Sequence, residues 1–403
     1  MKNSVQGKMV LFGAGKIGRS FIGQLFSRGG YEVVFIDISE PIIDALNRQG
    51  NYNVVIRGER EDILHIKNVR GVVATDEKKV ADEIATAGIL AVSVGSYGLP
   101  STISLIAKGL LKRFETNREV PLDIIIAENL RNGAEFFREK LMAQLPDWYP
   151  IDILVGLVET SIGKMVPIMT EKDAENDILQ VFAEPYNTLI LDKVAFRNPI
   201  PDVEGLAPKE NMKAWVDRKL FIHNLGHACA AYCGYFNYPD LTYMYEVLAH
   251  DEVMDFTRTA MLQSSKILDA LYPGVFTESE LQKHIEDLIF RFRNKELGDT
   301  VFRVGCDLER KLGADDRMIA PLHAGVRLKL SVDKIAEAIF FGLFFRAKDE
   351  NGSRHKGDVI FIERIAKEGL WEVMQNVGRM DDTEYKILLK QFVKHKRSAK
   401  IIF

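Results

Sequence analysis

One short segment of the 403-residue chain carries three side chains that suit acid–base chemistry on a hydroxyl group. In Lys219-Leu-Phe-Ile-His-Asn224-Leu-Gly-His227, a lysine, an amide and an imidazole lie five and three residues apart. On an α-helix they fall at about 0°, 140° and 80° around the axis, so they share one face. Lysine can act there as a general base if burial or a neighbouring cation lowers its pKa. The pattern favours a polyhydroxyl substrate. Gly226 would leave room for a ligand beside the three polar side chains.

Other chemistries fit this segment less well. The plain alternative is a polar helix face that closes an interdomain surface, and His223 is assigned to a core or an interface. A short-chain dehydrogenase would need Tyr-x-x-x-Lys, and none of the 12 tyrosines has a lysine four positions later. Cys229 and Cys233 lie near His227, but cysteines on an alanine-rich helix are usually small buried residues, so no metal site is predicted.

A glycine motif near the amino terminus predicts a dinucleotide site. Gly13-Ala-Gly15-Lys-Ile-Gly18 follows an apolar run and opens an amphipathic stretch, and a second apolar run ends at Asp37. In this context the glycines permit a tight turn, close approach of a pyrophosphate and helix–strand packing. Asp37 would bind the ribose hydroxyls and repel a 2′-phosphate, which favours NAD over NADP; a plain βα turn and a FAD protein are the alternatives. The predicted cofactor-binding residues are Gly13, Gly15, Lys16, Ile17, Gly18, Asp37, Val94, Gly95 and Asn129.

The pattern of apolar residues predicts two domains. Up to about residue 198, runs rich in Val, Ile and Leu alternate with amphipathic stretches, as in a parallel sheet covered by helices. Beyond it, apolar residues recur at three- and four-residue spacing, which indicates helices. We therefore expect an α/β Rossmann-type doubly wound parallel sheet domain over 1–198 and a mainly α-helical substrate and catalytic domain over 199–403. The expected strands are Met9–Phe12, Tyr31–Ile36, Ile89–Val94, Ile124–Ala127 and Ile153–Val158.

Composition limits the partners and the location. Lys and Arg number 53 against 57 Asp and Glu, a net charge of −4, which gives no global attraction to nucleic acid or an acidic membrane. Three cysteines are too few for a disulfide framework and fit a reducing compartment. No apolar stretch approaches the roughly 18 residues of a membrane-spanning helix, and we find no signal peptide pattern. We expect a cytoplasmic enzyme, monomeric or a small homo-oligomer, that acts on a small molecule.

Taken together, the motifs resemble the polyol-specific long-chain dehydrogenase/reductase family, the mannitol dehydrogenase family. The resemblance begins with Phe12-Gly-Ala-Gly-Lys-Ile-Gly-Arg-Ser-Phe-Ile-Gly23 and Ala127-Glu-Asn-Leu-Arg-Asn-Gly133. It continues through Trp215–Ala228, Arg291–Asn294, Arg303–Gly305 and Arg310–Pro321, and weakens towards the carboxyl terminus. The family includes mannitol 2-dehydrogenases, mannitol-1-phosphate 5-dehydrogenases, and fructuronate and tagaturonate reductases. The Glu-Asn pair and the length are closest to the mannitol-1-phosphate 5-dehydrogenases.

The resemblance implies a metal-independent mechanism. Lys219 would be the general base in polyol oxidation and the acid in ketose reduction. Asn224 and Asn129 would hold the substrate oxygen as charge builds on it, and His227 would hydrogen-bond a hydroxyl. Asn129 also lies where a strand is expected to end, which is where open α/β sheets place ligands, although a turn residue would give the same pattern. Asn132 is the second choice for that role.

Basic residues supply a candidate site for an anionic group of the substrate. Arg303, Arg310, Lys311 and Arg317 lie close in sequence, and arginine binds phosphate or carboxylate through paired hydrogen bonds. Surface charges at helix ends are the alternative. Relatives usually carry Asp-Arg before a Val/Ile-x-Pro, whereas this chain has Gly163-Lys164, and the positive charge makes Lys164 a further candidate.

These observations predict an NAD-dependent oxidoreductase that interconverts a polyol phosphate and a ketose phosphate, with mannitol 1-phosphate and fructose 6-phosphate as the expected pair. The alternative is a free polyol, as in mannitol 2-dehydrogenase or arabinitol dehydrogenase, or a hexuronate. A non-catalytic NAD-binding protein is disfavoured because cofactor binding requires none of Lys219, Asn224 and His227. A β-hydroxyacid dehydrogenase is disfavoured because we find no Gly-Gly-rich substrate loop.

Overall fold

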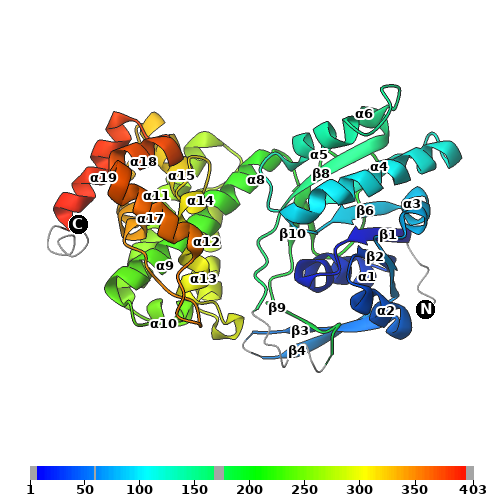
Figure 1. Ribbon diagram of the computed structural model, residues 1–403, viewed down its shortest axis with the longest axis horizontal. Helices are drawn as coiled ribbons and strands as arrows, with labels where there is room; N and C mark the ends of the chain where they lie inside the picture. The colour runs from blue at the N-terminus through cyan, green and yellow to red at the C-terminus, as the bar shows by residue number, and fades with distance from the viewer. Residues whose placement is uncertain (1–6, 59, 168–176, 396–403) are drawn as a thin grey trace. The chain divides into compact units, whose positions relative to one another are not determined.

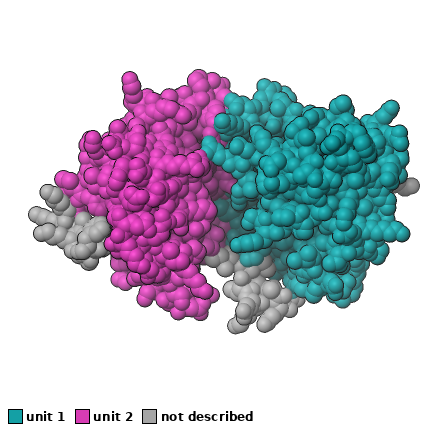
Figure 2. Space-filling model, turned by 45° about the horizontal axis from the view of Figure 1, so that its top comes forward, with its two compact units in different colours: residues 1–216 teal, residues 217–403 magenta. Residues whose placement is uncertain are grey.

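The computed structural model describes residues 7–58, 60–167 and 177–395, and the chain divides into two compact units. Unit 1 is residues 1–216 and unit 2 is residues 217–403 (Figure 2). The division falls within helix α8 (Met212–Arg218), later than the boundary expected near 198. The difference arises because the last strand of the unit 1 sheet, β11 (Leu206–Lys209), lies beyond that point. Pro208 is tolerated in β11 because this strand lies at the edge of the sheet.

Unit 1 is built on an eight-stranded sheet with the order β11-β10-β8-β7-β6-β1-β2-β5. Figure 1 labels β1, β2, β6, β8 and β10 of this sheet. The strands from β8 to β5 are parallel to their neighbours, and β10 is antiparallel to β8. The strand order reverses between β1 and β6, and ligands of such sheets bind beside the carboxyl ends at that point. The strands are β1 (Gly7–Phe12), β2 (Tyr31–Asp37), β5 (Val69–Val73), β6 (Ile89–Val92), β7 (Leu122–Ile126), β8 (Val155–Ser161) and β10 (Leu189–Asp192).

Both faces of this sheet are buried, which explains why its strands are continuous apolar runs. In β1, Met9 and Leu11 belong to one core, with side chains of η1, α1 and α2, whereas Val10 and Phe12 belong to a second core, with side chains of α3, α4 and α5. The five expected strands are present, but the last begins at Val155 because the preceding residues form the short helix α6 (Ile151–Leu154). The helices are η1 (Gly18–Gly23), α1 (Gln24–Arg28), α2 (Glu40–Gln49), α3 (Glu77–Ala85), α4 (Leu99–Thr116) and α5 (Gly133–Met142).

A second sheet of three strands, which the sequence analysis does not predict, belongs to unit 1. Strands β3 (Asn51–Ile56) and β4 (Asp62–Lys67) form an antiparallel hairpin, and β9 (Val181–Ala183) pairs in parallel with β3. Tyr52 of β3 is completely buried, and its hydroxyl donates a hydrogen bond to the carbonyl of Arg19 at 2.7 Å. The second sheet therefore supports the beginning of η1, next to the glycine motif.

Unit 2 is mainly helical in its described residues, as expected (Figure 1). Helix α8 continues directly into the π-helix η3 (Lys219–Asn224) and then into α9 (Leu225–Asn237). No helix among the described residues is long and apolar enough to cross a membrane. The other helices are α10 (Met244–Val247), α11 (Asp251–Leu271), α12 (Glu278–Phe292), α13 (Val301–Gly305), α14 (Leu308–Lys311), α15 (Ile319–Arg327), α16 (Asp333–Leu343), α17 (Lys356–Glu368), α18 (Leu370–Val377) and α19 (Asp382–Lys394).

Candidate active site

The glycine motif forms the turn between β1 and η1, and its three glycines differ in their surroundings. Gly13 has a φ of 97°, and a Cβ there would overlap the carbonyl oxygen of Ser93. A Cβ on Gly18 would overlap the carbonyl oxygen of Gly13. Gly15 is exposed, and a Cβ there would meet no heavy atom of the described chain within 4 Å. Two glycines therefore build the turn, and the third leaves its backbone open, as close approach of a pyrophosphate requires.

Asp37 ends β2 and contacts the glycine turn. One of its carboxylate oxygens accepts a hydrogen bond from the N–H of Ala14 at 2.6 Å, and the other accepts one from the N–H of Ser39 at 2.9 Å. The side chain is half-buried, and each carboxylate oxygen can accept a further hydrogen bond. Asp37 thus orders the turn and still has acceptor capacity for a hydroxyl group.

The loop after β6 is held by a carboxylate, Glu128, for which no site role is predicted from the sequence. Glu128 follows β7, and one of its oxygens accepts hydrogen bonds from the N–H of Val94 at 2.6 Å and of Gly95 at 2.8 Å. Burial raises the pKa of Glu128, against the effect of these two N–H donors. An acidic residue directly after an expected buried strand was the available signal. All nine predicted cofactor-binding residues lie at one edge of the sheet, beside the ends of β1, β2, β6 and β7, and the side chain of Asn129 is exposed there. They are Gly13, Gly15, Lys16, Ile17, Gly18, Asp37, Val94, Gly95 and Asn129.

In unit 2, the segment from Lys219 to Asn224 is a π-helix rather than an α-helix. The N–H of Leu225 bonds to the carbonyl of Leu220, five residues earlier. In such a turn, residue i+5 takes the place of residue i+4, so Lys219 and Asn224 lie about 40° apart instead of about 140°. His227, one α-helical turn further on, returns to within about 20° of Lys219. The π-turn therefore aligns the three predicted catalytic side chains more closely than the α-helical spacing suggests.

The environment of Lys219 suits a general base. Burial, and secondarily the nearby guanidinium of Arg317, lower the pKa of Lys219 to about 8. Both causes are those that the sequence analysis required for a lysine base. Around pH 8 the amine is therefore partly uncharged, and the uncharged amine can accept a proton.

The buried imidazole of His227 stacks on an aromatic ring and lies near a carboxylate. Its ring stacks on Phe292, with centroids 4.4 Å apart and an interplanar angle of 3°. Burial lowers the pKa of His227 well below its ordinary value, and four nearby cations, Arg303, Arg317, Lys311 and Arg291, act in the same direction. Nε2 lies 3.4 Å from Oδ2 of Asp299, but it forms no hydrogen bond with any described residue. A buried polar atom of this kind needs a partner, and a substrate hydroxyl would supply one.

Three further side chains surround His227. No site role is predicted for Phe292 or Asp299 from the sequence. Asp299 is buried and forms an ion pair with Arg303. The signal for Asp299 was its spacing, because an acid four residues before an arginine on a helix start pairs readily. His223 is buried, with its ring 5.5 Å from that of Phe292, as the core assignment for this histidine expects.

The basic residues predicted to bind an anion divide into two groups. Arg303, Lys311 and Arg317 act together on the pKa of His227, whereas Arg310 is not among its principal neighbours. Burial, aided by Arg317, lowers the pKa of Lys311 to about 8. All four side chains have partners within the unit: Arg303 pairs with Asp299, Arg310 with Asp307 and Asp316, and Arg317 with Asp316 at 2.8 Å, while Lys311 donates to the carbonyl of Val304 at 2.6 Å.

Lys164 lies in unit 1 and is buried. Its Nζ donates hydrogen bonds to the carbonyl of Tyr186 at 2.7 Å and to the side-chain oxygen of Asn187 at 3.0 Å. The same Nζ lies 5.3 Å from the ring centroid of Phe21. These contacts give Lys164 a structural role in unit 1, and substrate binding by this residue stays a prediction.

Two other expectations about α9 can be compared with the structure. The expectation that Gly226 leaves room for a ligand is wrong, because Met261 of α11 fills the space beside it. Cys229 and Cys233 are buried, and burial raises the pKa of Cys233 to about 12. Within residues 7–58, 60–167 and 177–395, no three His, Cys, Asp or Glu side chains are grouped so that they could hold a metal ion.

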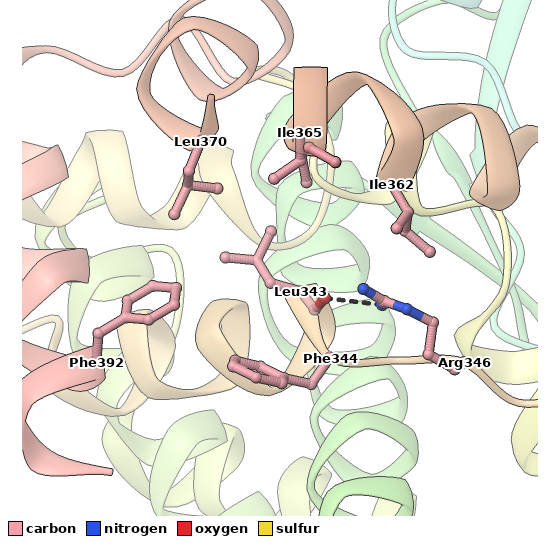
Figure 3. A pocket seen from close by; sticks show the side chains of 8 residues that line it. Leu343, Phe344, Arg346, Ile362, Ile365, Leu370 and Phe392 are labelled. Atoms are coloured by element: carbon pink, nitrogen blue, oxygen red, sulfur yellow. Dashed lines mark hydrogen bonds between the residues drawn. The ribbon is translucent and has the colours of Figure 1, made fainter. Parts of the chain in front are cut away.

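Unit 2 also contains an apolar pocket of about 80 Å³ between α16, α17, α18 and α19 (Figure 3). Arg346 donates from Nη1 to the carbonyls of Leu343 and Phe345 at 2.8 Å, so its nearest acceptors are backbone atoms. An aliphatic and aromatic lining offers no set of donors for a polyhydroxyl molecule. We therefore do not place the substrate there. The lining residues are Leu343, Phe344, Arg346, Ile362, Ile365, Ala366, Leu370 and Phe392.

Family models match both parts of the chain. A model described as the mannitol dehydrogenase Rossmann domain matches residues 7–205, and one described as the mannitol dehydrogenase C-terminal domain matches residues 211–396. The chain belongs to the mannitol dehydrogenase family. The resemblance noted from the sequence motifs is thereby confirmed.

Similar members of the mannitol dehydrogenase family come from Lactococcus lactis. The mannitol-1-phosphate 5-dehydrogenase of Lactococcus lactis subsp. cremoris strain MG1363 is 33% identical over 350 residues, which are 86% of this chain and 88% of that protein. The enzyme of the same name from strain SK11 is 30% identical over 392 residues, 96% of this chain and 98% of that protein. A solved structure, Pseudomonas fluorescens mannitol 2-dehydrogenase in a ternary complex with NAD and D-mannitol, has a TM-score of 0.75 and 16% identity. This structural match covers 99% of this chain and 94% of the mannitol 2-dehydrogenase chain, and it shows that the two proteins share a fold.

Proposed function

We propose that this member of the mannitol dehydrogenase family is an NAD-dependent, metal-independent oxidoreductase that interconverts mannitol 1-phosphate and fructose 6-phosphate. The observation that carries the proposal is the lowered pKa of Lys219, about 8, on a π-turn that aligns it with Asn224 and His227. The relatives from Lactococcus lactis, named mannitol-1-phosphate 5-dehydrogenases, support the choice of substrate.

The residues at the sheet edge fit a dinucleotide. Gly15 is exposed and has open space beside it, so its backbone can approach a pyrophosphate. Asp37 would accept hydrogen bonds from the adenosine ribose, and Val94 and Gly95 would line the loop that Glu128 orders. NAD, when bound, supplies the acceptor for the hydride of the substrate carbon.

The proposed chemistry assigns one role to each side chain of unit 2. In polyol oxidation, the amine of Lys219 takes the proton of the reacting hydroxyl while the C–H bond of the same carbon gives up its hydride. Asn224, with Asn129 of unit 1, would donate hydrogen bonds to the oxygen as negative charge develops on it. Nε2 of His227, which forms no hydrogen bond within the described part of the chain, would bind a hydroxyl and fix its position. In ketose reduction, the ammonium of Lys219 returns the proton.

The phosphate would be bound by the basic residues near His227. Arg303, Lys311 and Arg317 are close enough to lower the pKa of His227, so together they provide positive potential beside the reacting hydroxyls. Arg310 and Lys164 remain weaker candidates because neither is among the cations that lower the pKa of His227. A hexuronate, or less readily a free polyol, is the alternative substrate, since the same cations would bind a carboxylate.

A substrate panel tests the proposal. Purified protein is mixed with NADH and fructose 6-phosphate, fructose, fructuronate or tagaturonate, and the loss of NADH absorbance is followed. We expect fructose 6-phosphate to give the highest kcat/KM. A preference for fructuronate or tagaturonate would replace the phosphate by a carboxylate, and activity with none of the four would contradict the proposal. Dialysis against a chelator should leave the rate unchanged.

The pH dependence should follow Lys219, whose pKa is about 8. Oxidation needs the neutral amine, so kcat for polyol oxidation should rise with pH around 8, and kcat for ketose reduction should fall there. Arg317→Gln removes a nearby cation and should move both midpoints to higher pH. Arg327→Gln, at an exposed arginine of α15, is the control. Unmoved midpoints in Arg317→Gln would contradict this electrostatic coupling.

Asp37→Asn should shift selectivity from NADH towards NADPH. The amide of Asp37→Asn retains an acceptor for the N–H of Ala14 or Ser39, but it no longer repels a 2′-phosphate. The second variant, Asp37→Ala, should weaken NADH binding more than NADPH binding. Fluorescence titration with the two cofactors gives the ratio of Kd values. Asp44→Asn, at an exposed position on α2, is the matched control. An unchanged ratio in both Asp37 variants would remove Asp37 from ribose recognition.

The proposal also includes the setting of the enzyme. We place it in the cytoplasm, as a monomer or small homo-oligomer that acts on a small molecule and binds neither nucleic acid nor membrane. The net charge of −4 and the three cysteines support this setting. Size-exclusion chromatography with light scattering measures the oligomeric state.

A further inference from the structure

A buried arginine lies behind the glycine turn, outside the predicted cofactor-binding residues. Arg19 is the second residue of η1, and only 6% of its surface is exposed. Its Nε donates a hydrogen bond to the carbonyl of Ala14 at 2.7 Å, and its Nη1 donates one to the carbonyl of Ile178 at 2.9 Å. Burial lowers the pKa of Arg19, but an arginine keeps its charge in proteins. A charged donor is therefore fixed on the inner side of the turn.

The contact with Ala14 determines where the next N–H points. A trans peptide is planar, so the carbonyl of Ala14 and the N–H of Gly15 point in opposite directions. Arg19 holds this carbonyl on the buried side, and the N–H of Gly15 must therefore face the exposed side, where Gly15 has open space. At the other end of the residue, Asp37 holds the N–H of Ala14 at 2.6 Å. Ala14 is thus fixed by two side chains of opposite charge.

Arg19 is itself held in place by its own backbone. Its N–H donates to the carbonyl of Gly15 at 3.0 Å, and its carbonyl accepts from the buried hydroxyl of Tyr52 at 2.7 Å. Gly23 makes room for this contact, since a Cβ there would lie 3.0 Å from the Tyr52 hydroxyl. The backbone from which the guanidinium extends is therefore fixed to the turn on one side and to β3 on the other.

We propose that Arg19 is a positioning residue for the pyrophosphate of the cofactor: by holding the Ala14 carbonyl inward, it presents the N–H of Gly15 to the anion. This inference rests on the proposed NAD-dependent function. Arg19 need not touch the cofactor itself. Its charge, fixed in a poorly hydrated position, also adds to the attraction for the anion.

The test compares two buried arginines of unit 1. Arg113 is also 6% exposed, and it donates hydrogen bonds to the carbonyls of Ala85, Ala87, Val120 and Pro121 rather than to the glycine turn. Arg19→Met, Arg19→Lys and Arg113→Met are prepared as full-length proteins. For each, Kd for NADH, for ADP-ribose and for adenosine is measured by fluorescence or calorimetry, and urea unfolding gives the stability.

We expect Arg19→Met to weaken the binding of NADH and of ADP-ribose by about 10–100-fold. This is the effect of losing one charge-assisted hydrogen bond, here the bond from the N–H of Gly15 to the pyrophosphate. Adenosine, which has no pyrophosphate, should bind with little change. Arg19→Lys should give an intermediate loss because its compact ammonium lacks the planar fork with which Nε and Nη1 reach the two carbonyls. Arg113→Met should lower stability without changing Kd for NADH.

Four results are decisive. Unchanged NADH and ADP-ribose affinity in Arg19→Met, or equal losses for adenosine, would overturn the inference. If Arg19→Met does not fold, Arg19→Lys decides it by the same comparison, and wild-type affinity there would overturn it. Failure of the wild-type protein to bind NADH would instead reject the proposed function.

Discussion

Replacing Lys219 by alanine should lower kcat in both directions by on the order of 10²–10⁴-fold, the usual range for loss of an acid–base group. Lys219 is the group on which burial and Arg317 act to bring the pKa to about 8. Steady-state kinetics with mannitol 1-phosphate and NAD, and with fructose 6-phosphate and NADH, measure the loss. NADH affinity should be little changed, because the glycine turn belongs to unit 1 and Lys219 to unit 2.

Two further variants separate the chemistry of Lys219 from its charge. Lys219→Arg keeps a cation, but a guanidinium does not deprotonate in proteins, so this variant should be as slow as Lys219→Ala in polyol oxidation. Lys213→Ala, at an exposed lysine of α8, should retain wild-type kcat. Near-wild-type oxidation by Lys219→Ala or Lys219→Arg would remove Lys219 from the base role.

Alanine at Gly15 and at Gly18 should cause different defects. In Gly18→Ala the Cβ would overlap the carbonyl oxygen of Gly13, so the folded state should lose about 1–3 kcal/mol or more from overpacking. In Gly15→Ala the Cβ meets no heavy atom of the described chain within 4 Å, so stability should be nearly unchanged. The same Cβ would occupy the space where a pyrophosphate approaches, so NADH affinity should fall by at least about tenfold.

Urea unfolding and NADH titration of the two variants measure these effects. Gly50→Ala, at the end of α2 with a φ of 66°, is a control for glycine loss away from the turn. It should lower stability through backbone strain without changing Kd for NADH. Wild-type NADH affinity in Gly15→Ala would show that no anion approaches this backbone, and the cofactor assignment at the turn would then fail.

Much of unit 1 could be predicted because its signals are local. Strands β1, β2, β6 and β7 are buried on both faces, so continuous apolar runs mark them. Strand β11 carries Pro208, and the short β9 has no long apolar run, so tertiary pairing alone identifies them as strands. The two units divide after Val216 rather than near residue 198, because β11 belongs to the sheet of unit 1.

The candidate site could be predicted as a set of residue types, but its geometry could not. The α-helical spacing assumed for Lys219 and Asn224 does not hold, because the segment is a π-helix. Gly226 was expected to leave room for a ligand, whereas the side chain of Met261, from another helix, fills the space beside it. Glu128 and Asp299 carry at most a weak sequence signal and Phe292 carries none. Their contacts with Val94 and Gly95 or with His227 are what connect them with the site.

The sequence by itself determined the βα turn with its three glycines, the acidic end of β2 and the lysine, amide and imidazole of unit 2, because each depends on residue type and short spacing. The tertiary structure decided the chemistry that these groups can perform. Burial and Arg317 lower the pKa of Lys219, and burial with four nearby cations lowers the pKa of His227. Arg19 turns the Ala14 peptide through a carbonyl contact. Desolvation and charge proximity depend on side chains distant in sequence, so only the folded chain can set them.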